Sequence, residues 1–117
     1  MTISDLSSKG FNVEEAMEFC VDDEEIYLEV LETALEEGKE KVPLFKELLV
    51  NKDFDRYIIE AHGLKNAAKQ IGCDKLSEIA KTSELSGKAG DIDAMVANHD
   101  ALLEEYERVL EVIEQLF

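Results

Sequence analysis

Residues 53–72 have the sequence DFDRYIIEAHGLKNAAKQIG, and they decide the fold class because their apolar residues recur with the period of an α-helix. At 100° per residue, one face of this helix carries four apolar side chains, namely Tyr57, Ala61, Leu64 and Ala68. Asp53 is a residue type that caps helix N-termini, and Gly72 is one that follows helix C-termini in the left-handed conformation. The stretch therefore predicts an amphipathic helix from about Asp53 to Ile71.

The same periodicity extends over the rest of the chain, and no segment alternates with the period of two that a strand requires. Capping residues and glycines predict further helices over residues 12–20, 22–38, 39–50, 73–87 and 91–116. A proline is tolerated in the first turn of a helix, so Pro43 favours a helix break shortly before residue 43. Alternatively, residues 22–38 and 39–50 form one bent helix. We therefore predict an all-α fold, an antiparallel four-helix bundle preceded by one or two short N-terminal helices.

The length of 117 residues suits a single domain, which we divide into an N-terminal extension, residues 1–10, and a bundle domain, residues 11–117. Hydrophobic residues make up 45% of the chain, which is enough for a buried core. Cys20 and Cys73 match neither a disulfide framework nor a metal-binding spacing. Both are expected to be buried thiols in a reducing compartment.

The charge of the chain limits its partners. Against 28 Asp and Glu there are 12 Lys and Arg, and the net charge of −16 repels nucleic acid and anionic lipid. No stretch resembles a signal peptide or a membrane span. We therefore expect a cytoplasmic protein with no nucleic-acid or membrane partner.

His62 lies on the face of the 53–72 helix opposite the apolar stripe. Lys65 follows it by one turn and Lys69 by two, and Ile59 is an exposed apolar side chain one turn before it. Each feature alone is also common on an ordinary solvated helix, and a lone histidine is often a core residue. Together they indicate a docking surface around a reactive centre. The predicted outward face comprises Asp55, Ile59, His62, Asn66 and Lys69.

The run AHGLKNAAKQIG, residues 61–72, resembles the phosphorylation motif of histidine-containing phosphotransfer (HPt) domains. In that motif an Ala-His pair is followed by a hydrophobic residue, a Lys, small residues, and a Gly ten positions after the His. The resemblance covers essentially the whole chain, because residues 76–91 match the family's next helix and loop and residues 12–35 match its leading helices. One position differs, since this chain has Asn66 where the family commonly has Gly.

The resemblance implies that His62 accepts a phosphoryl group from the aspartyl phosphate of a receiver domain and passes it to another response-regulator receiver. It also implies a hybrid histidine kinase upstream, with Mg²⁺ on the receiver partner only and no cofactor or metal on this chain. An imidazole with an unperturbed pKa of about 6.5 is a nucleophile that needs no separate base. Lys65 and Lys69 would offset the phosphoryl charge of about −2, and Gln70 would orient the ring. The residues expected to contact the partner are Asp55, Ile59 and Asn66.

Other functions fit the sequence less well. The chain has no Gly-rich phosphate loop, so we expect neither ATP binding nor kinase activity. We therefore do not expect the protein to be an enzyme. Di-iron bundles need Glu-x-x-His pairs, whereas Ile59 and Val96 precede the two histidines by three residues. His99 and Asp100 form the dipeptide of HD phosphohydrolases, but the other ligands are missing, and His99 is expected to be a partly buried packing residue. The alternative that stays open is a helical adaptor that docks on receiver or kinase domains without accepting phosphate.

The negative charge is unevenly distributed along the chain. Residues 1–51 contain 14 acidic and 4 basic residues, a balance of −10, whereas residues 52–81 contain 5 acidic and 6 basic residues. The near-neutral segment carries His62, so an acidic receiver pocket can approach there. A bundle with one polar face per helix is compatible with a monomer, which is the state we expect.

Overall fold

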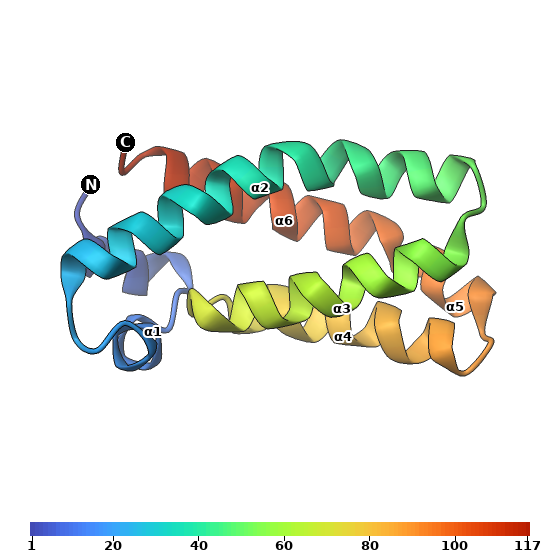
Figure 1. The fold of residues 1–117 in the computed structure, drawn as a ribbon, viewed down its shortest axis with the longest axis horizontal. Coiled ribbons are helices and arrows are strands. Elements are labelled where there is room, and N and C mark those ends of the chain that lie inside the picture. The colour runs from blue at the N-terminus through green and yellow to red at the C-terminus, as the bar shows by residue number, and fades with distance from the viewer.

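The computed structural model describes residues 1–117, and all of its regular structure is helical (Figure 1). A 3₁₀-helix, η1 (Ile3–Lys9), and a short helix, α1 (Val13–Phe19), precede the long helix α2 (Glu24–Val50). The chain continues with α3 (Phe54–Gln70), α4 (Asp74–Lys88), α5 (Ile92–Ala97) and α6 (His99–Glu114). The predicted all-α class is confirmed. None of the helices combines the length and the apolar character that a membrane span requires.

Four helices, α2, α3, α4 and α6, lie along the 40 Å axis of the molecule, and successive ones run antiparallel (Figure 1). The most extensive packing is between α3 and α4, and α2 packs against both α6 and α3. Their apolar faces enclose one core, because burying these faces is the main favourable contribution to folding. Its fully buried large side chains include Tyr27, Leu31, Phe45, Tyr57, Leu76, Leu102 and Ile113. The predicted four-helix bundle is confirmed.

Side-chain caps fix the residues at which helices begin. Oδ1 of Asp53 accepts a hydrogen bond from the N–H of Arg56 at 3.3 Å, as the sequence predicts for the start of α3. At the start of α2 the capping residue is Asp23, whose Oδ1 accepts from the N–H of Glu25 at 2.9 Å. Asp22 has a left-handed backbone with φ of 58°, so this helix begins later than the predicted residue 22.

The helix α2 continues through both residues at which the sequence suggested a break. Gly38 is buried inside α2, and a Cβ at this position would collide with the side chain of Leu110 on α6. This glycine therefore permits close packing of two helices and does not end a helix. Pro43 lies on the exposed side of α2. A proline has no N–H to donate to the carbonyl four residues earlier in the helix, but on this side water can reach that carbonyl. The predicted end at Gly38 is wrong, and the alternative of one continuous helix is confirmed.

The single last helix predicted over residues 91–116 is divided at Asn98 into α5 and α6. The side-chain Nδ2 of Asn98 donates to the carbonyl of Ile79 at 2.9 Å and to Oγ of Ser83 at 2.8 Å, both on α4. These bonds attach the α5–α6 junction to α4. Val96, two residues before this junction, is 41% exposed.

The first ten residues pack against the bundle. Ile3 and Leu6 of η1 are buried in the core, and Phe11 follows them there. The N–H of Asn12 donates to the carbonyl of Gly72 at 2.7 Å, so the N-terminal segment contacts the end of α3. Gly72 has φ of 85°, a conformation that favours glycine, as the sequence predicts for the residue that follows this helix.

Candidate functional site

The exposed face of α3 carries His62 near its centre, as predicted, and the imidazole side chain is 52% exposed. Three residues predicted to contact a partner are exposed on the same face, because their spacing follows the helical repeat; they are Asp55, Ile59 and Asn66. Ile59 is 67% exposed. An open surface therefore presents the imidazole beside an apolar side chain.

A buried carboxylate from α4 holds the inner side of the imidazole. Glu84 is 1% exposed, and its Oε2 accepts a hydrogen bond from Nδ1 of His62. Two ammonium groups bind the same carboxylate, with Nζ of Lys65 2.7 Å from Oε1 and Nζ of Lys88 3.2 Å from Oε2. Each oxygen of this buried carboxylate is therefore satisfied by donors.

These contacts define the charge of Glu84 and the tautomer of His62. Burial alone would raise the pKa of Glu84, but the hydrogen bonds from Lys65, His62 and Lys88 outweigh it and hold this pKa at about 2. A charged carboxylate only accepts hydrogen bonds, so the network assigns a proton to Nδ1 of His62. The lone pair of the neutral ring is then on Nε2. The side-chain Nδ2 of Asn66 lies 3.3 Å from Nε2 and donates to it.

Two other predicted site residues lie away from the imidazole. Nζ of Lys69 is 3.1 Å from Oε1 of Glu15 and 3.2 Å from Oδ1 of Asp74. These hydrogen bonds raise the pKa of Lys69, with Glu15 the larger cause. Gln70 lines a cavity against α2 and makes no hydrogen bond with His62. The structure therefore brings Lys65 and Asn66 to the histidine, but neither Lys69 nor Gln70, and the ring is oriented by the Glu84 carboxylate.

A cavity of about 320 Å³ lies beside the site between α3 and α4. Three lysines line it, Lys65, Lys69 and Lys81, together with the carboxylates of Asp74 and Glu78. Positive charge therefore exceeds negative charge at this place, although the whole chain has a net charge of −16. An acidic partner is repelled less here than elsewhere on the surface.

The second histidine, His99, is a packing residue in the core, as predicted. It is 6% exposed, and its Nδ1 lies 2.7 Å from the hydroxyl of Tyr57. Burial raises the pKa of Tyr57, so the phenol stays protonated and donates this hydrogen bond. Burial also lowers the pKa of His99, which favours the neutral ring. Of the two histidines, His62 alone is open to a partner.

The sequence matches the model of the Hpt domain family over residues 22–112, a range that includes α3 and the exposed histidine. The chain belongs to the Hpt domain family. Hpt domains carry out histidine phosphotransfer in two-component signalling, and the family match confirms the resemblance found in residues 61–72. No curated protein matches the chain, and no solved structure does.

Glu84 and Lys88 were not among the residues predicted from the sequence. A signal for Glu84 exists in α4, where it occupies the same stripe as the buried Ala80 and Gly87 at helical spacing. A glutamate on an apolar stripe needs a buried partner, since an unpaired charge is costly there. That partner could be sought among the cations of the neighbouring helix α3.

Proposed function

We propose that this Hpt domain is a phosphorelay intermediate, in which His62 accepts a phosphoryl group from the aspartyl phosphate of one receiver domain and passes it to another. The observation that best supports this proposal is the bond between Nδ1 of His62 and buried Glu84, which leaves Nε2 as the nucleophile on the open face. The receiver of a hybrid histidine kinase would be the donor, and the receiver of a response regulator would be the acceptor.

The proposed chemistry needs no general base on this chain. In the first transfer the lone pair of Nε2 attacks phosphorus, and the bond from phosphorus to the aspartyl oxygen breaks, so that the carboxylate leaves with the electron pair. The ring becomes an N-phosphorylated cation that keeps its proton on Nδ1, and the Glu84 carboxylate compensates the positive charge. In the second transfer the acceptor's carboxylate attacks phosphorus, and the electrons of the N–P bond return to Nε2.

Positioning and charge stabilisation dominate phosphoryl transfer, and Mg²⁺ is expected on the receiver partner. On this chain, Lys65 and Lys88 are the cations that bind the same carboxylate, Glu84, as the histidine. The side chain of Lys88 is 58% exposed, whereas that of Lys65 is 25% exposed. Lys88 can therefore turn towards the phosphoryl oxygens, and we assign to it the charge compensation that the sequence suggested for Lys69.

The docking surface in this proposal surrounds His62 on two helices. Asp55, Ile59 and Asn66 present it on α3, and Leu85, which follows Glu84 on α4, is 53% exposed. Apolar side chains that border a charged centre suit a transient protein contact, since they exclude water around the transferring group.

Incubation of the protein with a phosphorylated receiver tests the proposal. The expected product carries a label that is stable in alkali and labile in acid, and ¹⁵N and ³¹P NMR spectra should place phosphorus on Nε2. His62→Gln is the control and should remove the label. The alternative function, an adaptor that accepts no phosphate, predicts receiver binding without label. A panel of receivers that yields no label, or undiminished label on His62→Gln, contradicts phosphotransfer.

A further inference from the structure

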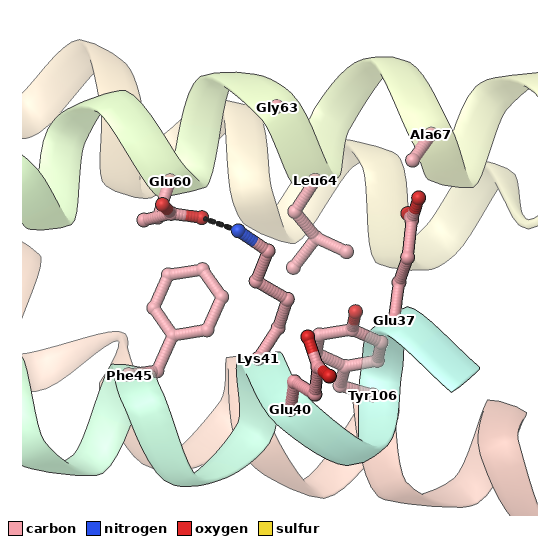
Figure 2. Close-up of a pocket in the computed structure, with 9 residues that line it drawn as sticks. All are labelled: Glu37, Glu40, Lys41, Phe45, Glu60, Gly63, Leu64, Ala67 and Tyr106. Carbon is pink, nitrogen blue, oxygen red and sulfur yellow. Dashed lines mark hydrogen bonds and ion pairs between the residues drawn. The ribbon is translucent and has the colours of Figure 1, made fainter. Parts of the chain in front are cut away.

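A second cavity, of about 460 Å³, lies between α2 and α3 and is not used by the proposed phosphotransfer (Figure 2). Gly63, the residue after His62, borders it, so the cavity and the imidazole occupy different sides of α3. Two aromatic side chains form part of its wall, Phe45 of α2 and Tyr106 of α6. Its charged groups are Glu37, Glu40 and Lys41 of α2 and Glu60 of α3.

The charges in this cavity are only partly compensated. Nζ of Lys41 lies 2.8 Å from Oε2 of Glu60, the contact drawn in Figure 2. Glu37 and Glu40 line the same space but take part in no ion pair or side-chain hydrogen bond. The lining residues comprise three carboxylates and one ammonium, a net charge of −2, which Arg56 reduces because its Nε lies 4.0 Å from Oε1 of Glu60. A cationic ligand would therefore be attracted to the cavity.

The hydroxyl of Tyr106 is an independent sign of a ligand. The ring of Tyr106 is buried, and the residue is 6% exposed, but its hydroxyl oxygen is open to the cavity and has no hydrogen-bond partner in the protein. Figure 2 shows this hydroxyl directed into the cavity between the side chains of Lys41 and Glu37. Burial raises the pKa of Tyr106, and Glu37 and Glu60 raise it further, so the hydroxyl stays neutral. Its oxygen can therefore accept a hydrogen bond from an N–H donor.

We propose that this cavity binds a free aliphatic diamine, with one ammonium group between Glu37 and the hydroxyl of Tyr106 and the other at Glu40. The Lys41–Glu60 pair is an example of the same ammonium–carboxylate contact within the cavity. The side chain of Ala67 and the methylene stem of Lys41 provide apolar surface for the methylene chain of the diamine. A diamine compensates both unpaired carboxylates, whereas one lysine side chain of a partner would leave one of them unpaired.

Titration of the ¹⁵N-labelled full chain with 1,4-diaminobutane at constant ionic strength tests this proposal. We expect saturable shifts of the amides of Gly63 and Ala67, which border the cavity on α3. Glu37→Gln and Tyr106→Phe should each weaken binding about fivefold, because each removes one ligand contact. Glu32→Gln is the matched control, since it removes an exposed carboxylate of α2 outside the cavity. This variant should bind 1,4-diaminobutane with the same affinity as the parent protein.

Three results would overturn the proposal. The first is the absence of saturable shifts up to millimolar diamine. The second is equal weakening by Glu32→Gln and Glu37→Gln, or shifts spread over the whole acidic surface, because either is typical of general charge screening. The third is tighter binding of Nα-acetyl-lysine amide than of the diamine, since it would assign the cavity to the side chain of a partner protein. None of these measurements depends on phosphotransfer by His62.

Discussion

The side-chain amide of Asn66 lies 3.3 Å from Nε2 of His62, the atom that carries the ring's lone pair. Because Glu84 holds the proton on Nδ1, Asn66 can only donate to Nε2, and its amide occupies the lone pair that would attack phosphorus. In the proposed transfer, the Asn66 side chain must therefore turn away before Nε2 attacks phosphorus. A glycine, common at this position in the family, imposes no such step.

Replacing Asn66 by Ala should accelerate phosphoryl transfer from a receiver to His62. A net hydrogen bond contributes about 0.5–1.5 kcal/mol, and the low end applies here because the contact is exposed. We therefore expect the rate to rise about two- to fivefold. Rapid-quench measurement of a single turnover, with the same phosphorylated receiver at saturating concentration, gives the rate.

Asn66→Gly serves as the second variant, because it removes the same donor but lowers helix stability by about 1 kcal/mol relative to Ala. Equal acceleration in the two variants would attribute the effect to the lost amide. A slower transfer in both variants would contradict the prediction, since it would mean that the amide assists the phosphoryl group more than it hinders the nucleophile.

Replacing Glu84 by Gln should slow the transfer at least about tenfold, because it reverses the tautomer of His62. The Lys65 ammonium can only donate, and it is the closer and less exposed of the two lysines, so it retains the amide oxygen as its acceptor, whereas the exposed Lys88 can turn to solvent. The amide nitrogen then faces Nδ1. That nitrogen donates, which moves the ring proton to Nε2 and removes the nucleophilic lone pair. ¹⁵N chemical shifts of the imidazole report the tautomer directly, independently of the transfer rate.

Glu78→Gln is the matched control for Glu84→Gln, since Glu78 is an exposed glutamate of the same helix without an ion pair to His62. Its imidazole shifts should equal those of the parent protein. If Glu84→Gln leaves the tautomer unchanged, the carboxylate does not determine the position of the ring proton.

The all-α class and the outward position of His62 could be predicted because both depend on local periodicity. Tyr57, Ala61, Leu64 and Ala68 define the buried side of α3 whatever packs against it. The partner of the imidazole could not be predicted in the same way. Glu84 is 22 residues away in the sequence and reaches His62 only through the packing of α4 on α3.

Gly38 and Lys69 have contacts that the sequence analysis did not predict, and these contacts have tertiary causes. Gly38 has the residue type of a helix end, but the position of Leu110 makes it a packing site inside α2. Lys69 has the spacing of a histidine neighbour, but Glu15 of α1 lies within 3.1 Å of its ammonium group. The sequence pattern of a segment predicts a role for each of these residues, but a side chain from another helix determines the contacts that the residue makes.

The buried histidine should make stability depend on pH. Burial lowers the pKa of His99 below its usual value of 6.5, with Lys46 acting in the same direction and Asp100 opposing. The unfolded chain therefore binds a proton at this residue at a higher pH than the folded chain. The free energy of unfolding should fall as the pH decreases below about 7 through the unfolded pKa. Urea denaturation at several pH values measures this dependence.

His99→Gln isolates this contribution, because the amide oxygen of Gln can still accept from the hydroxyl of Tyr57 but does not titrate. The variant should lose less stability than the parent between about pH 7 and pH 5.5. Parallel pH profiles for the two proteins would contradict a neutral, buried His99.

The two glycines Gly38 and Gly63 should respond oppositely to replacement by Ala. A Cβ at Gly38 would collide with Leu110, and overpacking of this kind costs about 1–3 kcal/mol, more than the helix propensity of Ala returns. Nothing lies near a Cβ at Gly63, so Gly63→Ala should raise the free energy of unfolding by up to about 1 kcal/mol. Urea denaturation measures both, and Leu110→Ala combined with Gly38→Ala should cost less than the sum of the single changes. Strict additivity would mean that Leu110 does not restrict Gly38, and the close approach of α2 to α6 would then need another cause.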